Sequence, residues 1–261
     1  MSVNEIGKVS WQQHHLVDAI PEFHELYKSR PISSNFGGMG FTHSFYTWFL
    51  AKHLSPSYII ESGVWYGHST WLLEKACPQS TVISLDPVDN RKYKSEHGVY
   101  SQADFTRIRW DELDKDKTLV FFDDHYGVDR VFQAKERGFT HILYEDNYHD
   151  CRGNSFNPRG SGCSPKACLT QNNAEGIALR RMLDTYYEFP PLYPNLTNER
   201  NWEWAKTSRE EYQQLSKPPL FNPGFPVPLS IETSLTDIVN GMDVVIADAP
   251  NYTWIAYLKL Q

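Results

Sequence analysis

The sequence predicts an α/β fold: a doubly wound, mostly parallel sheet with a C-terminal antiparallel hairpin. Between residues 58 and 144, short apolar runs of strand length alternate with helical segments. This alternation favours parallel strands joined by right-handed crossovers, with helices on both faces of the sheet. Near the C-terminus, two apolar runs follow each other across a short turn, which indicates an antiparallel hairpin added to the parallel sheet.

The N-terminal part is predicted to form two helices joined by a glycine-rich loop. Residues 11–30 are polar and aromatic and are expected to be helical. Residues 33–40 (SSNFGGMG) form the loop, and residues 42–54 form a helix capped by Thr42.

The alternating part of the chain supplies five strands. Each is a short run of apolar, β-branched or aromatic residues, and the helices between them end at turn residues such as Gly138. The predicted strands are 58–61 (YIIE), 81–85 (TVISL), 100–102, 118–122 (TLVFF) and 140–144 (THILY). The predicted helices are 69–76 and 128–137.

The alternation stops after residue 147. Residues 148–170 are predicted to form a loop rich in Gly, Asn, Ser and Pro, and residues 173–187 a helix. Two strands are then expected at 243–247 (DVVIA) and 253–260 (TWIAYLKL), and they form the closing hairpin.

The chain is interpreted as a single domain, 1–261, with two additions. Residues 1–40 form an N-terminal cap. Residues 150–240 are an insertion far longer than an ordinary connection, and many aromatic residues, including Trp202 and Trp204, fall in it. We expect these two regions to build the substrate pocket.

The composition restricts the partners of the chain. Of the 261 residues, 40% are hydrophobic and 22% charged, which argues against disorder and against a coiled coil. Aromatic residues make up 14%, enough for a large core and an aromatic-walled cleft. The net charge of −7 argues against a nucleic-acid partner. No apolar run is long enough for a membrane span, and the N-terminus lacks the apolar region of a signal peptide.

The segment 61–69 (ESGVWYGHS) is the most informative part of the sequence. It follows the first predicted strand and opens a helix, where Gly63 permits a tight turn and Gly67 lets the backbone approach a ligand. Asp86 ends the next strand, 23 residues after Gly63, where a carboxylate meets the hydroxyls of a ribose. The spacing is not G-x-G-x-x-G, which disfavours a dinucleotide bound by its pyrophosphate, and Glu61 suits a cationic ligand. The alternative is a glycine turn in some other α/β protein.

The pattern E-x-G-x-x-x-G-x-S, with an acid at the end of the second strand, resembles the cofactor motif of class I S-adenosylmethionine-dependent methyltransferases. The resemblance implies a Rossmann-like methyltransferase sheet that binds S-adenosyl-L-methionine at this edge. It places Glu61 and Gly63 near the methionine part, Asp86 at the ribose and Asp104 near the adenine. The other cofactor-binding residues in this interpretation are Tyr66, Gly67, His68, Ser69 and Asp123.

Two dense groups of polar residues follow neighbouring predicted strands. They are Asp123, Asp124 and His125 after the fourth strand, and Glu145, Asp146 and Asn147 after the fifth. The carboxyl ends of parallel strands meet at one edge, and carboxylates crowded there require shared protons or a cation. Oxygen ligands with one amide suit Mg²⁺, Mn²⁺ or Ca²⁺ rather than zinc. The alternative is that these residues cap helices and line solvated turns.

These two groups sharpen the resemblance. An Asp-His pair followed about twenty residues later by Asp-Asn resembles the metal-dependent catechol O-methyltransferase group, which implies Mg²⁺ ligands at Asp124, Asp146 and Asn147. The Glu145-Asp146 pair resembles the related cephalosporin hydroxylase and macrolide-sugar O-methyltransferase group. That second likeness adds Glu145 to the expected metal ligands and leaves the choice among Asp123, Asp124 and Glu145 open.

The catalytic base departs from the catechol group. That group has a lysine shortly after its Asp-His pair, but Tyr126, Gly127 and Val128 follow here. We therefore predict His125 as the catalytic base, because an imidazole accepts a hydroxyl proton near neutral pH. The alternative is that His125 only hydrogen-bonds to a metal-bound carboxylate.

Together these features predict an S-adenosylmethionine-dependent methyltransferase that methylates a hydroxyl of a small molecule, phenolic or sugar-like, with the help of a divalent cation. Two alternatives stay open: a metal-independent methyltransferase, with nitrogen as one option for the methylated atom, and a methyltransferase-fold protein that binds a ligand without turnover. A homodimer is also left open.

The expected location is the cytoplasm. However, Cys151, Cys163 and Cys168 lie close together in the sequence, and Asn195-Leu-Thr197 and Asn251-Tyr-Thr253 are glycosylation sequons. A secretory route with a disulfide therefore stays open, with reduced thiols as the alternative.

Overall fold

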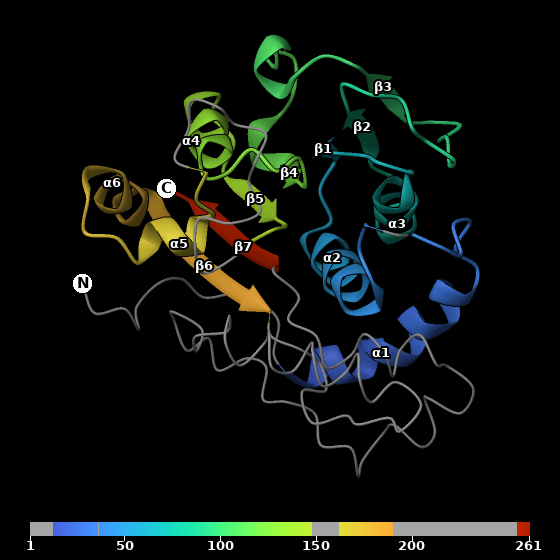
Figure 1. The fold of residues 1–261 in the computed structure, drawn as a ribbon. Helices are drawn as coiled ribbons and strands as arrows, with labels where there is room; N and C mark the ends of the chain where they lie inside the picture. The colour runs from blue at the N-terminus through green and yellow to red at the C-terminus, as the bar shows by residue number, and fades with distance from the viewer. Residues whose placement is uncertain (1–12, 36, 148–161, 190–254) are drawn as a thin grey trace.

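The computed structural model describes residues 13–35, 37–147, 162–189 and 255–261, which form a seven-stranded sheet with helices on both faces (Figure 1). The strand order is β3-β2-β1-β4-β5-β7-β6. The strands are β1 (Tyr58–Ser62), β2 (Thr81–Leu85), β3 (Val99–Ser101), β4 (Thr118–Phe122), β5 (His141–Tyr144), β6 (Leu183–Phe189) and β7 (Ile255–Leu260). Strands β1 to β5 pair in parallel, whereas β7 is antiparallel to both β5 and β6. The predicted fold class is confirmed.

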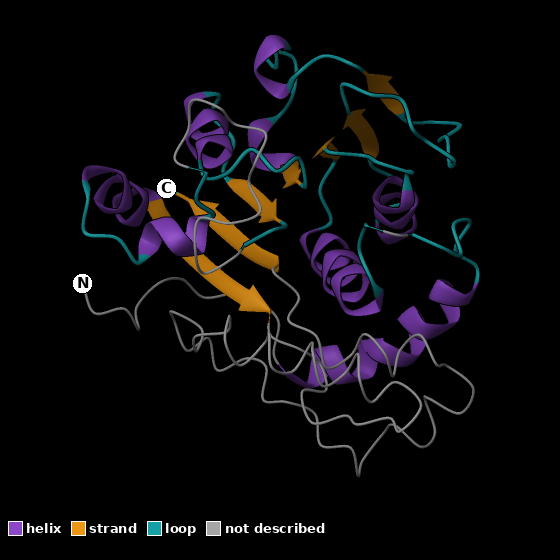
Figure 2. Ribbon diagram, in the orientation of Figure 1, coloured by secondary structure: helices purple, strands orange, loops and turns teal. Residues whose placement is uncertain are grey.

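The helices divide between the two faces of the sheet (Figure 2). One face carries α1 (Gln13–Lys28), α2 (Phe41–Leu54) and α3 (His68–Ala76). The other carries α4 (Asp129–Glu136), α5 (Pro165–Leu169) and α6 (Ala174–Met182). Two short 3₁₀ turns, η2 (Phe105–Arg107) and η3 (Lys115–Lys117), lie between β3 and β4.

Strand β4 shows why continuous apolar runs predicted the centre of the sheet. All five of its residues are buried. Leu119 and Phe121 pack in the core beneath α1, α2 and α3, whereas Val120 and Phe122 pack in the core beneath α4 and α6. A strand covered on both faces needs apolar side chains at successive positions, and TLVFF supplies them.

The antiparallel pair differs from the predicted hairpin. The sequence predicts a helix through residue 187, but α6 ends at Met182 and residues 183–189 form β6. Strand β7 pairs with β5 on one edge and with β6 on the other. The C-terminal antiparallel pair is thus present with β6 and β5 as the described partners of β7, and the predicted strand at 243–247 lies outside the described residues.

Two smaller predictions also change. Helix α2 has Gly40 as its N-cap without a side-chain cap, so the predicted Thr42 cap is wrong. Thr42 lies inside the first turn, where it is buried. The predicted loop 148–170 contains the short helix α5, which Ser164 caps through a hydrogen bond from the Ala167 amide.

Several predictions fall on parts of the chain outside the described residues. They are most of the insertion 150–240, Trp202, Trp204, the strand at 243–247, Cys151 and both sequons. Within the described residues, no helix combines the length and the apolar character that crossing a bilayer requires.

Candidate active site

Glu61, near the end of β1, is completely buried. Its Oε2 accepts hydrogen bonds from Thr70 Oγ1 on α3 and from Ser84 Oγ on β2, each at 2.6 Å. Burial raises the pKa of Glu61 to about 7, and the hydroxyls of Ser69, Ser84 and Thr70 oppose that rise. The carboxyl group therefore joins β1, β2 and α3 beneath the glycine turn.

The glycine turn lies directly against the end of β4. Gly63 has a φ of 95°, and a Cβ there would lie 2.0 Å from the carbonyl oxygen of Asp123. Gly67 has a φ of 88°, and its Cβ would lie 2.6 Å from the carbonyl oxygen of Tyr93. Both positions require glycine because neighbouring backbone of the protein itself comes so close.

Asp86, at the end of β2, anchors this turn. Its Oδ2 accepts hydrogen bonds from the amides of Val64 and Trp65 at 3.0 and 3.1 Å, and its Oδ1 accepts one from the amide of Val88 at 2.9 Å. Asp86 is half-buried. A carboxylate oxygen has two lone pairs, so this group can also accept from a ribose hydroxyl without releasing the turn.

The outer side of the turn presents two stacked aromatic rings. Trp65 is 44% exposed and has a left-handed φ of 49°. Its ring stacks on that of Tyr66, with centroids 4.6 Å apart, and the Lys92 ammonium lies 3.5 Å from the centre of the Tyr66 ring. Of the predicted cofactor residues, Tyr66 is therefore one that lies at the surface of the turn.

His68 and Ser69, at the start of α3, are buried beneath the turn. His68 Nε2 lies 2.9 Å from Ser44 Oγ on α2, and its ring meets that of Tyr27 edge-on. Burial lowers the pKa of His68 to about 4, so its imidazole is neutral near pH 7. These two residues support the turn from the core.

Asp123, His125 and Asp146 converge at the carboxyl ends of β4 and β5. One ligand atom from each lies within 4.8 Å of the others. His125 Nδ1 is in close contact with Asp146 Oδ2. This hydrogen bond, together with the charges of Asp146 and Asp123, raises the pKa of His125 to about 9. His125 and Asp146 both have left-handed backbone, with φ of 54° and 58°.

Glu145 completes this group, which we call the acidic cluster: Asp123, His125, Glu145 and Asp146. Burial and the neighbouring carboxylates raise the pKa values of Asp123 and Glu145 well above their usual range, and the two side chains are hydrogen-bonded to each other. His43, on α2, lies beside the cluster, with its Nδ1 3.8 Å from Glu145 Oε1.

The chemistry of the acidic cluster fits a divalent cation. Carboxylates packed this closely keep protons, as the raised pKa values of Asp123 and Glu145 indicate. A cation offsets the same repulsion without protons, and carboxylate oxygens with one imidazole suit Mg²⁺ or Mn²⁺. The residues present therefore fit the group that the sequence predicts.

Asp124 is engaged elsewhere. Its Oδ2 accepts hydrogen bonds from Ser62 Oγ at 2.6 Å and from Arg130 Nε at 2.7 Å. The buried Arg130 guanidinium also lies 2.6 Å from Asp104 Oδ2. Burial alone would raise the pKa of Asp104, but hydrogen bonds from Arg130 and Thr106 lower it to about 2. Asp124 and Asp104 thus form an ion-pair network around Arg130.

Asn147 is likewise engaged away from the acidic cluster. Its Oδ1 accepts a hydrogen bond from the Lys166 amide at 2.9 Å, and its Nδ2 donates to the Tyr186 hydroxyl at 2.8 Å. The side chain is completely buried. Its amide joins the end of β5 to α5 and β6.

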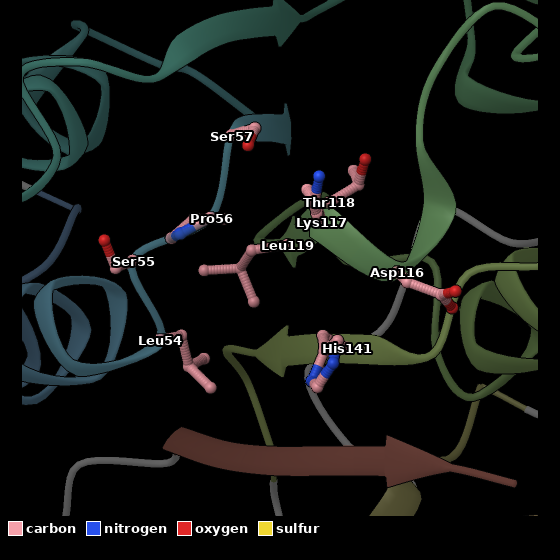
Figure 3. Close-up of a pocket in the computed structure, with 9 residues that line it drawn as sticks. All are labelled: Leu54, Ser55, Pro56, Ser57, Asp116, Lys117, Thr118, Leu119 and His141. Carbon is pink, nitrogen blue, oxygen red and sulfur yellow. The ribbon is translucent and has the colours of Figure 1, made fainter.

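A cavity of about 390 Å³ lies at the opposite edge of the sheet (Figure 3). The link between α2 and β1 and the beginnings of β4 and β5 form its walls. The lining residues are Leu54, Ser55, Pro56, Ser57, Asp116, Lys117, Thr118, Leu119 and His141. Since these residues belong to the amino ends of the strands, the length of the sheet separates the cavity from the acidic cluster.

The described cysteines are in two states. Cys77 and Cys168 are buried free thiols, and burial raises their pKa values to about 11 and about 12. Cys163 is disulfide-bonded. Such high pKa values make Cys77 and Cys168 poor nucleophiles.

The structure brings together only some of the predicted site residues. His125, Glu145 and Asp146 meet as expected, and Asp123, expected on the cofactor side, joins them. Asp124 and Asn147, expected there as metal ligands, bond to other residues. Asp104, expected near the adenine, pairs with Arg130. The sequence reasoning missed His43, Ser62 and Arg130. A basic residue six positions after Asp124 was a usable signal for Arg130, whereas no local pattern points to His43.

The chain matches no family model and no curated protein. An O-methyltransferase from Bacillus cereus in complex with SAH aligns at 12% identity, covering 66% of this chain and 78% of that one, with a TM-score of 0.35. The O-methyltransferase TomG from Streptomyces achromogenes, in complex with SAM, aligns at 11% identity over 71% and 84%, with a TM-score of 0.37.

A cyclopropane-fatty-acyl-phospholipid synthase-like protein from Lactobacillus casei covers more of the chain. It aligns at 12% identity over 95% of this chain and 98% of that one, with a TM-score of 0.39. Likenesses of this degree do not bear on function, so the functional argument rests on the geometry of the site.

Proposed function

We propose that this protein is an S-adenosylmethionine-dependent methyltransferase that methylates a hydroxyl of a small molecule with the help of a divalent cation. One observation carries the proposal. The Gly63 backbone lies against the Asp123 carbonyl, so the glycine turn and the acidic cluster are direct neighbours at one edge of the sheet. A methyl donor at the turn and a hydroxyl at the cluster would then meet. Ligands of open α/β sheets bind at this edge.

The turn offers groups for the cofactor. Asp86 is held by three backbone amides and has a lone pair of Oδ1 left for a ribose hydroxyl. The rings of Trp65 and Tyr66 lie on the outer side of the turn, where they can cover a bound nucleoside. Glu61, His68 and Ser69 act from below, because they are buried and fix the shape of the turn.

The acidic cluster offers groups for the cation and the hydroxyl. Asp123, Glu145 and Asp146 would hold Mg²⁺ or Mn²⁺. When bound, such a cation supplies Lewis-acid chemistry that lowers the pKa of a hydroxyl and offsets the carboxylate charges that raise the pKa of His125. Because Asp146 holds His125 Nδ1, Nε2 is the atom that would accept the hydroxyl proton. The rest of catalysis is orientation of the two reactants.

The two additions to the domain would supply the acceptor pocket. Within residues 1–40, α1 packs on α2, which carries His43 to the acidic cluster. Within residues 150–240, Cys163 and Lys166 contact the loops after β4 and β5. The second addition therefore reaches the edge where a phenolic or sugar-like acceptor would bind, and the first packs against the helix that carries His43 there.

Calorimetry tests the cofactor half of the proposal. S-adenosylmethionine should bind the wild-type protein, and Asp86→Ala should weaken binding at least about 10-fold, because it removes the ribose acceptor and the anchor of the turn. Asp89→Ala is the matched control, since Asp89 lies in the same loop but pairs with Arg91. Absence of any binding to the wild type would overturn the proposed function.

Chelation tests the cation half. Methyl transfer to a simple catechol or to a sugar hydroxyl should stop in chelator and return with added Mg²⁺ or Mn²⁺. Full activity in chelator would favour the metal-independent alternative. Cofactor binding without transfer to any acceptor, with or without cation, would favour a binding protein.

A further inference from the structure

A closed ring of hydrogen bonds lies behind the acidic cluster. The Lys166 amide donates to Asn147 Oδ1, and Asn147 Nδ2 donates to the Tyr186 hydroxyl. That hydroxyl donates to Glu188 Oε1 at 2.8 Å, and Lys166 Nζ donates to Glu188 Oε2 at 3.1 Å. All four residues are at most 2% exposed. We call Asn147, Lys166, Tyr186 and Glu188 the buried ring.

The buried ring touches both loops that carry the acidic cluster. Asn147 directly follows Asp146 in the loop after β5. Three residues before Lys166, the Cys163 carbonyl accepts a hydrogen bond from the Val128 amide at 2.7 Å, in the loop after β4. The segment from Cys163 to Lys166 therefore bridges the two loops, and Tyr186 and Glu188 secure it to β6.

The backbone of the acidic cluster needs such a support. His125 and Asp146 adopt left-handed conformations that non-glycine residues rarely take. Strained residues of this kind persist only where the surroundings determine the conformation. The residue after Asp146 is Asn147, and both ends of its amide are fixed by the buried ring.

The charged pair of the buried ring supports the same conclusion. A buried pair such as Lys166 and Glu188 gains little net stability, because desolvation offsets the attraction. What such a pair does define is geometry, since every partner must be in place to satisfy the charges. A geometric role beside a catalytic group accounts for a charged network at this depth.

We infer that Asn147, Lys166, Tyr186 and Glu188 are positioning residues, which hold Asp146 and His125 in the arrangement that binds the cation. This inference rests on the proposed function and changes one part of the predicted site. Asn147 acts through its neighbours and is not itself a ligand, because its amide is engaged with Lys166 and Tyr186.

The substitution Tyr186→Phe tests the inference, because it removes only the hydroxyl that links Asn147 to Glu188. The matched control is Tyr257→Phe on the adjacent strand β7, where the lost hydroxyl bonds to His141 at the other edge of the sheet. Calorimetry with Mn²⁺ alone should show at least about 10-fold weaker binding for Tyr186→Phe and unchanged binding for Tyr257→Phe. Equal affinity in folded Tyr186→Phe and wild type would overturn the inference.

A second variant distinguishes support from ligation. Asn147→Asp keeps the oxygen that accepts from Lys166 but loses the donor to Tyr186. A ligand at position 147 would bind Mn²⁺ as well or better as a carboxylate, whereas a positioning residue would lose affinity. Retained or tightened binding would therefore contradict the inference.

Hydrogen exchange without metal separates this inference from the proposed function. Peptides covering residues 123–128 and 144–147 should exchange at least about 10-fold faster in Tyr186→Phe than in Tyr257→Phe. If the wild type binds no Mn²⁺, the cation part of the proposed function fails while exchange still measures the support. If Tyr186→Phe leaves hydrogen exchange in these peptides unchanged, the buried ring does not support the two loops, whatever calorimetry with Mn²⁺ shows.

Discussion

Two acidic groups, Glu61 and the acidic cluster, lie side by side at the carboxyl edge of the sheet, and their partners differ. Glu61 meets hydroxyls: Thr70 and Ser84 donate to it, and Ser69 lies near. Asp123, by contrast, meets Glu145 and Asp146, which are acids themselves. The fold therefore supplies hydroxyl donors to Oε2 of Glu61, whereas the acids that face one another in the cluster repel unless protons, His125 or a cation offset their charge. This difference supports the proposal that Glu61 is structural and that the acidic cluster is the site of chemistry.

Gly63 stands between the two groups, and its substitution should have the largest effect. In Gly63→Ala the new Cβ would overlap the Asp123 carbonyl, so the end of β4 must move. We expect a loss of about 4 kcal/mol in the free energy of unfolding, from the backbone shift and the left-handed conformation together. Urea denaturation measures this loss.

The control for this prediction is Gly138→Ala. Gly138 also has a left-handed φ, of 81°, but its Cβ would meet only Lys115 Cγ at an ordinary 3.6 Å. Its cost should be about 1 kcal/mol, from the conformation alone. Similar losses in both variants would show that the contact between Gly63 and Asp123 does not join the two groups.

The second-largest expected effect is a dependence of stability on pH that comes from Glu61. Its pKa is about 7 in the folded protein against an ordinary 4.5, so the folded state binds more protons between these values. Stability from this group is therefore full below pH 4.5 and falls as the pH rises to 7, by about 3 kcal/mol. Glu61→Gln keeps acceptors for Thr70 and Ser84 and should remove this fall.

Urea denaturation of both proteins at pH 5 and pH 8 checks this prediction. Glu61→Gln should exceed the wild type at pH 8 by about 2.5 kcal/mol more than at pH 5, with or without Mn²⁺. A constant difference between the two proteins at both pH values would mean that Glu61 is not a proton-binding group of the folded state.

The smallest expected effect is that of Glu145→Gln on stability, and its sign should differ between chelator and saturating cation. Glu145→Gln removes one negative charge from the acidic cluster and should gain about 1 kcal/mol of stability in chelator. In saturating Mn²⁺ the variant should be less stable than the wild type, because it has lost a ligand and gains less from binding. Thermal unfolding in the two buffers measures this. An equal gain of stability in chelator and in Mn²⁺ would mean that Glu145, like Glu61, has a structural role only.

The parts of the fold that the sequence predicted are those that local patterns determine. TLVFF and the YII of YIIE are short apolar runs between turn residues, and such runs are typical of strands covered on both faces. The glycines of segment 61–69 marked the turn after β1 for a similar local reason. The prediction of a helix over residues 183–187 is wrong because no Gly or Pro marks the end of the capped helix before them. Their strand partner, β7, is also far away in the chain.

The candidate site shows the same division. The sequence placed acids at the ends of β4 and β5, but not the direction of each side chain. Asp123 joins the acidic cluster while Asp124 turns to Ser62 and Arg130, and Asn147 turns to Tyr186. Those choices depend on residues distant in the sequence, so the motifs identified the segments that meet at this edge but not the partner of each side chain.

The place of β7 between β5 and β6 determines the order in which the chain can assemble. In the described sheet β6 pairs with β7 alone, and residues 190–254 are synthesised between the two strands. At about 5–20 residues per second, β6 leaves the ribosome several seconds before its partner exists. A nascent chain can therefore complete β1 to β5, with the acids already in place, while Tyr186 and Glu188 still lack the strand that secures them. During that interval the crowded carboxylates lack the support of the buried ring, so a cation bound at the proposed site would act on folding as well as on the proposed chemistry.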